Sequence, residues 1–211
     1  RITRHPLLDE IYTFHDALIA DNCDGRVLEV AHGQYAHPEA DIAVDIFPAN
    51  ANSVACQGTI ADVRQLPFDN NSFDSIIGRR FLHHVPGSDR GKILSECGRV
   101  LRADGRLIIL EGTPGIYRRA VKGVAFAAGF LGEDTDDYGH LSSDEIRGAI
   151  NGAEMNILKE RSLGSPLMPL SWFNRDSFRC IMPLVKRTQY IRWWTFIVAE
   201  SPNSHTGLSG I

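Results

Sequence analysis

The sequence lacks a basic excess, a long apolar run and closely spaced cysteines. Its 211 residues carry 22 Lys and Arg against 26 Asp and Glu, which gives a formal net charge of −4. We therefore expect no nucleic-acid ligand, because binding to a phosphate backbone depends on a basic surface. The longest apolar stretch, residues 120–132, is shorter than the roughly 20 residues that cross a bilayer. No membrane-spanning segment is expected either.

The cysteines stand far apart and form no pair typical of a zinc knuckle or a redox dithiol. They are Cys23, Cys56, Cys97 and Cys180. We expect free thiols in a reducing cytosol, and hence a cytoplasmic protein. The length and the absence of internal repeats predict a single domain over residues 1–200. The polar, Gly- and Ser-rich residues 201–211 are expected to form a flexible C-terminal tail.

Short runs rich in Val and Ile alternate with stretches of helical spacing, which is typical of a parallel sheet wrapped by helices. The patterns predict helices over residues 6–20, 88–101 and 142–150, and strands over 26–30, 42–46, 53–59, 73–78, 106–111, 155–162 and 190–200. Ala103-Asp104-Gly105 is expected to stop the middle helix before the next strand. Residues 117–131 are compatible with a further helix, and residues 172–186 are ambiguous.

Three segments carry a more specific signal. They are the run 27–33 (VLEVAHG), the run 43–46 (AVDI), and the series from Ala61-Asp62-Val63 to His83-His84-Val85 with the helix, turn and strand that follow it. In this order and spacing they resemble a class I S-adenosylmethionine-dependent methyltransferase of the small-molecule type, over about residues 27–200. The resemblance implies an α/β, Rossmann-like doubly wound sheet, mostly parallel with an antiparallel last strand and helices on both faces.

The resemblance also implies a cofactor, S-adenosylmethionine, with S-adenosylhomocysteine as the product. It assigns Asp45 to the ribose, Asp62 to the adenine amine with the backbone of Val63 beside it, and Glu29 to the glycine loop around Gly33. Carboxylates suit these positions, because the ribose hydroxyls, the adenine amine and the ammonium group are all hydrogen-bond donors. Open α/β sheets bind ligands at the carboxyl ends of their strands.

The sequence departs from the family pattern in its glycine loop. Ala31 and Tyr35 stand where the family has its first and third glycines, and only residues 31–41 connect the first two strands. Parallel strands need a crossover of about ten to twelve residues, usually with a helix, so the helix here must be very short or missing. Two hypotheses stay open. Either His32, Tyr35 or Arg79 takes over cofactor contacts, or the chain has lost the cofactor and serves as a binding subunit or catalyses a different small-molecule reaction.

Methyl transfer requires in-line attack on the methyl group, and a general base where the nucleophile still carries its proton. Histidine is the usual base near neutral pH. The candidates are His83, His84 and His140, with His83 first. We expect no metal site, although His32 and His37 with two nearby aspartates carry the right ligand atoms.

The remaining candidates concern substrate and partners. Arg79 and Arg80 follow an apolar strand, and one guanidinium is expected to reach the crevice edge, where it suits a carboxylate. The alternative is a solvated surface pair. The expected ligand is a small biosynthetic molecule, and a homodimer or a biosynthetic protein partner stays open.

Overall fold

The computed structural model describes residues 6–52, 54–113, 141–163 and 194–201. The expected helix at 117–131, the ambiguous segment 172–186, His140, Cys180 and all but the first residue of the expected tail lie outside these ranges. So does the beginning of the last expected strand.

Within these ranges, seven strands form one sheet in the order β3-β2-β1-β4-β5-β7-β6. They are β1 (Val27–Val30), β2 (Ile42–Asp45), β3 (Gln57–Ile60), β4 (Phe73–Arg79), β5 (Leu101–Gly112), β6 (Asn156–Leu163) and β7 (Trp194–Glu200). β7 pairs antiparallel with both β5 and β6, whereas β1 to β5 pair in parallel. The prediction of a mostly parallel sheet with an antiparallel last strand is confirmed.

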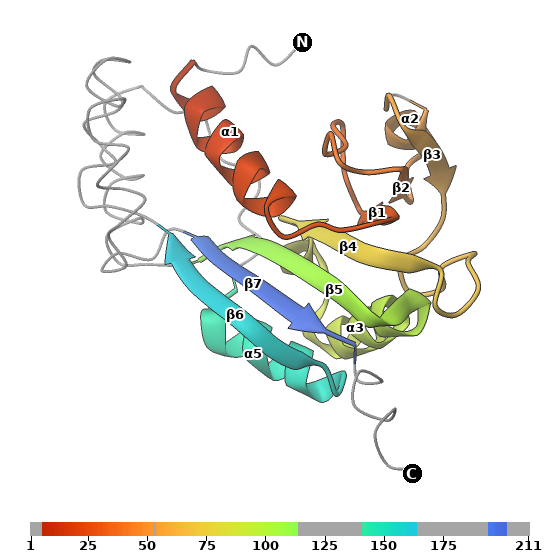
Figure 1. Ribbon diagram of the computed structural model, residues 1–211, viewed down its shortest axis with the longest axis vertical. Coiled ribbons are helices and arrows are strands. Elements are labelled where there is room, and N and C mark those ends of the chain that lie inside the picture. Colours follow the sequence, from red (N-terminus) through yellow and green to blue (C-terminus); the bar gives the residue numbers. More distant parts are fainter. Residues whose placement is uncertain (1–5, 53, 114–140, 164–193, 202–211) are drawn as a thin grey trace.

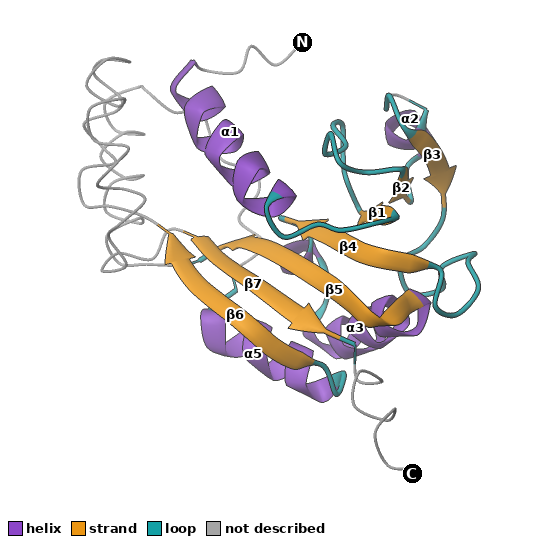
Figure 2. Cartoon of the chain, in the orientation of Figure 1, coloured by secondary structure: helices purple, strands orange, loops and turns teal. Residues whose placement is uncertain are grey.

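Helices cover both faces of this sheet, with α1 (Pro6–Ala20) on one side and α3 (Gly87–Val100) and α5 (Ser143–Gly152) on the other (Figures 1 and 2). Ile19 of α1 packs in a cluster with Phe196 of β7, and Leu94 of α3 packs with Ile146 of α5 in a second cluster. All four side chains are fully buried. Each such burial stabilises the fold by about 1.5–3 kcal/mol.

The expected strand over residues 53–59 was placed too early. A short helix, α2 (Pro48–Ala51), follows β2, and β3 begins only at Gln57. The helix lies directly on β3, because a Cβ added to Gly58 would come within 1.7 Å of the Ala51 carbonyl oxygen. The proline at its start suits a first helical turn and was the sequence signal for this helix. The β-branched residues after the proline favoured a strand, which is why the strand was predicted too early.

The expected turn at Ala103-Asp104-Gly105 was also wrong. α3 ends at Val100 and β5 begins at the next residue, Leu101. The extra residues are absorbed by an irregularity in the β4–β5 ladder, where Phe73 faces Leu101 but Ser75 faces Arg106. A bulge of this kind lets a strand continue past residues that would otherwise form a turn.

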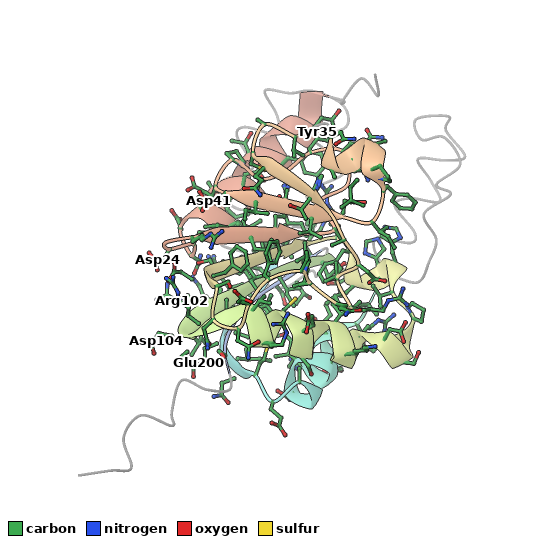
Figure 3. The ribbon with its side chains drawn as sticks, turned by 90° about the vertical axis from the view of Figure 1, so that its right-hand side faces the viewer. Asp24, Tyr35, Asp41, Arg102, Asp104 and Glu200 are labelled. Atoms are coloured by element: carbon green, nitrogen blue, oxygen red, sulfur yellow. The ribbon has the colours of Figure 1, made fainter. Side chains whose placement is uncertain are left out.

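Charged residues line the amino-terminal side of the parallel strands. Figure 3 shows Asp24, Asp41, Arg102, Asp104 and Glu200 along one side of the molecule. Arg102 and Asp74 form an ion pair there, as do Arg106 and Asp24. This edge is a solvated polar rim.

Within the described ranges, no helix combines the length and apolarity needed to cross a membrane.

Candidate active site

The described residues enclose a cavity of about 960 Å³ at the carboxyl ends of the central parallel strands, which is the usual ligand position in such a sheet. Its size suits a cofactor-sized ligand. The predicted site residues on its wall are Gly33, Asp45, Asp62, Val63, Arg79, His83 and His84. Glu29 lies beneath the wall, fully buried. The structure thus brings together residues that are up to 55 positions apart in the chain.

Asp45 ends β2 and is almost fully buried. Its Oδ2 accepts a hydrogen bond of 2.9 Å from the Gly33 amide, and its Oδ1 accepts one of 2.8 Å from the Phe47 amide. A carboxylate offers about four lone-pair positions, so these two amides leave acceptor capacity on both oxygens. The carboxylate is fixed in place and remains able to accept from two hydroxyl groups.

Asp62 follows the neighbouring strand β3 and is engaged differently. Its Oδ1 accepts from the backbone amide of Arg64 at 2.9 Å, and its Oδ2 accepts from Nη2 of the same arginine at 2.6 Å. The side-chain hydrogen bond from Arg64 is the main reason that the pKa of Asp62 is lowered. A ligand amine must therefore compete with Arg64 for this carboxylate.

Two apolar cavity residues were missed by the sequence analysis. Ile46 and Phe47 follow Asp45 directly and are 54% and 65% exposed. Adjacent exposed apolar side chains beside fixed polar groups are typical of a ligand wall. The signal was present, since the apolar run of the second strand continues beyond its terminal acid.

Residues 31–41 contain no helix. Ala31 adopts a φ of 50° and Gly33 one of 65°, so the loop keeps a left-handed conformation even where alanine replaces the first glycine. A Cβ added to Gly33 would meet no atom within 4 Å. The backbone at Gly33 therefore faces open space that a ligand can approach closely.

The loop is held by a buried ion-pair cluster. Arg79 donates from Nε to Glu29 at 2.6 Å, from Nη1 to Asp16 of α1 at 3.1 Å, and from Nη2 to the Tyr35 carbonyl at 2.9 Å. The second Glu29 oxygen accepts from the His37 amide at 2.5 Å. Arg79 thereby ties α1, β1, β4 and the loop together, in place of a crossover helix. Any role of Glu29 toward the cofactor stays a prediction.

The two histidines of the loop, His32 and His37, have different surroundings. His37 is buried, and its ring nitrogens contact the Asp16 carbonyl oxygen at 3.1 Å and the Glu39 amide at 3.2 Å. Burial is the main cause that lowers its pKa. His32 is also buried, and neither ring nitrogen has a hydrogen-bond partner among the described residues.

His83 forms a dyad with Glu111, a residue that the sequence analysis did not select. Nδ1 of His83 lies 2.7 Å from Oε2 of Glu111, which is fully buried at the carboxyl end of β5. The other carboxylate oxygen accepts from the amides of Phe81 and Leu82. An ionised carboxylate only accepts hydrogen bonds, so the proton of this contact belongs to Nδ1, and Nε2 is the nitrogen that accepts a proton. The missed signal was an acid that ends a buried strand.

The turn that carries the dyad depends on a glycine. A Cβ added to Gly78 would come within 2.5 Å of Cε1 in the buried Phe81 ring. We expect Gly78→Ala to lower the free energy of unfolding by about 1–3 kcal/mol, the usual cost of overpacking, and to displace His83. Urea unfolding measures the first effect, and the His83 ring resonances report the second. Gly91→Ala is the matched control, since its Cβ would meet no atom within 4 Å. A Gly78→Ala variant as stable as the wild type would show that the turn does not depend on this glycine.

Comparison with known proteins agrees with this geometry. Residues 22–109 match the family model of a methyltransferase domain. A demethylmenaquinone methyltransferase of Thermotoga maritima is 32% identical over 120 residues, which cover 53% of this chain and 52% of the relative. The matched part of the chain therefore spans about half the length of that relative.

Solved structures extend the likeness to the whole fold. Geranyl diphosphate C-methyltransferase from Streptomyces coelicolor, solved with S-adenosylhomocysteine, superposes with a TM-score of 0.60 at 12% identity, over 92% of this chain and 80% of that one. The [4+2]-cyclase SpnF superposes with a TM-score of 0.59 at 15% identity, over 90% and 80%.

The fold is thus that of the class I S-adenosylmethionine-dependent methyltransferases, as the sequence motifs predicted. The domain match covers residues 22–109, and the curated relative is itself named as a methyltransferase.

Proposed function

We propose that the chain is a cytoplasmic S-adenosylmethionine-dependent methyltransferase that acts on a small biosynthetic molecule. The observation that carries the proposal is the arrangement of one cavity. One wall places the fixed carboxylate of Asp45 beside the exposed Ile46 and Phe47, and the same cavity contains His83 with its buried partner Glu111. The first set suits a nucleoside, and the second suits proton transfer from an acceptor.

Each part of the cavity has a separate task in this proposal. Asp45 accepts from the ribose hydroxyls, Asp62 accepts from the adenine amine after exchange with Arg64, and the open backbone at Gly33 admits close approach. When bound, the cofactor supplies an electrophilic methyl group. Glu111 holds Nδ1–H of His83, so that Nε2 takes the proton of a hydroxyl, amine or acidic carbon on the acceptor. Alignment and the exclusion of water by the cavity wall complete the mechanism.

Binding of S-adenosylhomocysteine tests the proposal directly. By titration calorimetry, we expect micromolar affinity for the wild-type protein and a loss of about 10- to 100-fold in Asp45→Asn, because a hydrogen bond to a charged acceptor contributes about 1.5–3 kcal/mol. Asp41→Asn is the matched control. Asp41 also accepts a backbone amide, from Val27 at 2.8 Å, but precedes β2 at the opposite end of the strand. Equal losses in both variants would remove the ribose assignment.

A second candidate function follows from one observation. Arg79 donates hydrogen bonds to Glu29 and to the Tyr35 carbonyl of the loop, so these acceptors are already engaged within the protein. This favours a cavity that does not bind the amino-acid portion of the cofactor. A protein of the same fold is named as a cyclase, so other chemistry, or a binding-subunit role, remains the alternative. No heat with S-adenosylhomocysteine up to millimolar concentration, from folded protein, would favour it. Heat with the wild type favours the transferase and makes a screen of acceptors the next experiment.

A further inference from the structure

The two consecutive arginines at the end of β4 have different environments. Arg79 is almost buried, and its donors go to Glu29, Asp16 and the Tyr35 carbonyl. Arg80 is exposed, lines the cavity and forms no ion pair within the described part of the chain. Of the two guanidinium groups, Arg79 is committed to the fold, and Arg80 is the one available to a ligand.

The backbone conformation that directs Arg80 toward the cavity is an unfavourable one. Its φ is 50°, in the left-handed region that a long side chain seldom adopts. A hydrogen bond of 2.8 Å from its amide to the Leu110 carbonyl fixes this conformation. Strain that the surrounding structure enforces is concentrated at functional sites in proteins.

The guanidinium itself is held over a ring. The Arg80 Cζ lies 4.6 Å from the ring centroid of Tyr12, which also lines the cavity. Stacking uses the face of the guanidinium and keeps its N–H donors at the edge, where they match a carboxylate or phosphate in a bidentate manner. Arg80 is therefore oriented before any ligand arrives.

Among the described residues, no carboxylate forms an ion pair with Arg80. The third cavity arginine, Arg64, pairs with Asp62 and Asp89. His15 packs against Trp194 at the same end of the cavity, with ring centroids 4.8 Å apart. Burial first, and then the charges of Arg80 and Arg79, lower the pKa of His15 to about 3. This end of the cavity combines aromatic side chains with positive charge.

We propose that Arg80 binds an oxyanion of the substrate, a carboxylate or a phosphate, so that the chain acts on an acidic small molecule with a planar body. The inference rests on the proposed function, whose acceptor it narrows. Arg80 precedes His83 by three residues on the same connection, so an acceptor anchored at Arg80 presents its nucleophile on the side of the His83–Glu111 dyad.

Titration with simple probes, followed by the arginine Nε–Hε resonances in ¹⁵N-labelled protein, tests this proposal. The probes are benzoate, inorganic phosphate and neutral benzamide at constant ionic strength. We expect a saturable shift of the Arg80 resonance with benzoate or phosphate, and none with benzamide. Affinity should fall at least 10-fold in Arg80→Gln and less in Arg80→Lys. Arg161→Gln, a charge removal outside the cavity wall, should change nothing.

The outcomes separate the two proposals when each titration is run with and without S-adenosylhomocysteine. Benzamide binding as tightly as benzoate, or unchanged binding in Arg80→Gln, overturns the anion site. If S-adenosylhomocysteine binds but neither anion reaches Arg80, the inference fails and the transferase proposal stands. If the anions bind at Arg80 and S-adenosylhomocysteine does not bind, the transferase proposal fails and the anion site stands.

Discussion

Replacement of Arg79 with methionine is expected to lower the free energy of unfolding by about 3–5 kcal/mol, the usual result of removing one partner of a buried ion pair. Glu29 is fully buried, and Arg79 provides its only cationic partner among the described residues. Without the guanidinium, the carboxylate retains only the hydrogen bond from the His37 amide within that part of the chain. Because domains are stable by only about 5–15 kcal/mol, urea unfolding should show a large shift in midpoint.

A second variant separates charge from packing. The double variant Arg79→Met with Glu29→Gln removes the unpaired charge and should recover part of the lost stability, because neutral replacement of both partners is far less costly than loss of one. Arg147→Met is the control for an exposed pair, since Arg147 contacts Asp144 and Glu160 at the surface, and it should change stability little. A single variant as stable as the wild type would show that the cluster does not hold the loop.

The substitution Glu111→Gln is expected to slow methyl transfer by about 10²- to 10⁴-fold, the usual contribution of a positioned general base. An amide still accepts from the Phe81 and Leu82 amides through its oxygen. Its nitrogen, however, donates to His83 and so forces the proton from Nδ1 to Nε2. The turn keeps its shape while His83 loses its basic nitrogen on the reactive side.

The tautomer of His83 provides a readout that a purely structural role would not change. Long-range ¹H–¹⁵N correlations should show the proton on Nδ1 in the wild type and on Nε2 in Glu111→Gln. His84, whose ring centroid lies 4.0 Å from that of His83, supplies the neighbouring control, because His84→Gln should leave the His83 tautomer unchanged. An unchanged tautomer in Glu111→Gln, or unchanged transfer, would show that Glu111 does not position the base.

The sequence was sufficient to predict the parts of the site that follow from strand order. Asp45 could be placed because an acid that ends a buried parallel strand must lie at the ligand edge of the sheet, and the structure puts it on the cavity wall. Gly33, Asp62 and His83 lie on the same wall because each follows the carboxyl end of a parallel strand. Their roles as ligand contacts stay predictions.

Side-chain partners were not predictable, because they depend on which loops meet in space. The His83–Glu111 contact joins residues 28 positions apart, and the Arg79–Asp16 contact joins residues 63 apart. Nothing in the sequence around residue 79 shows that the Arg79 guanidinium forms ion pairs within the protein while the neighbouring Arg80 stays exposed. The replacement of a crossover helix by an ion-pair cluster is likewise visible only when β1, β4 and α1 are seen together.

A crystal structure of the chain with S-adenosylhomocysteine would test whether this cavity is a methyltransferase site. We expect ribose hydroxyls within hydrogen-bond distance of Asp45, the nucleobase against Ile46 and Phe47, and the sulfur on the side of His83. A ligand bound elsewhere, or no ligand in the cavity at concentrations that saturate calorimetric binding, would contradict it.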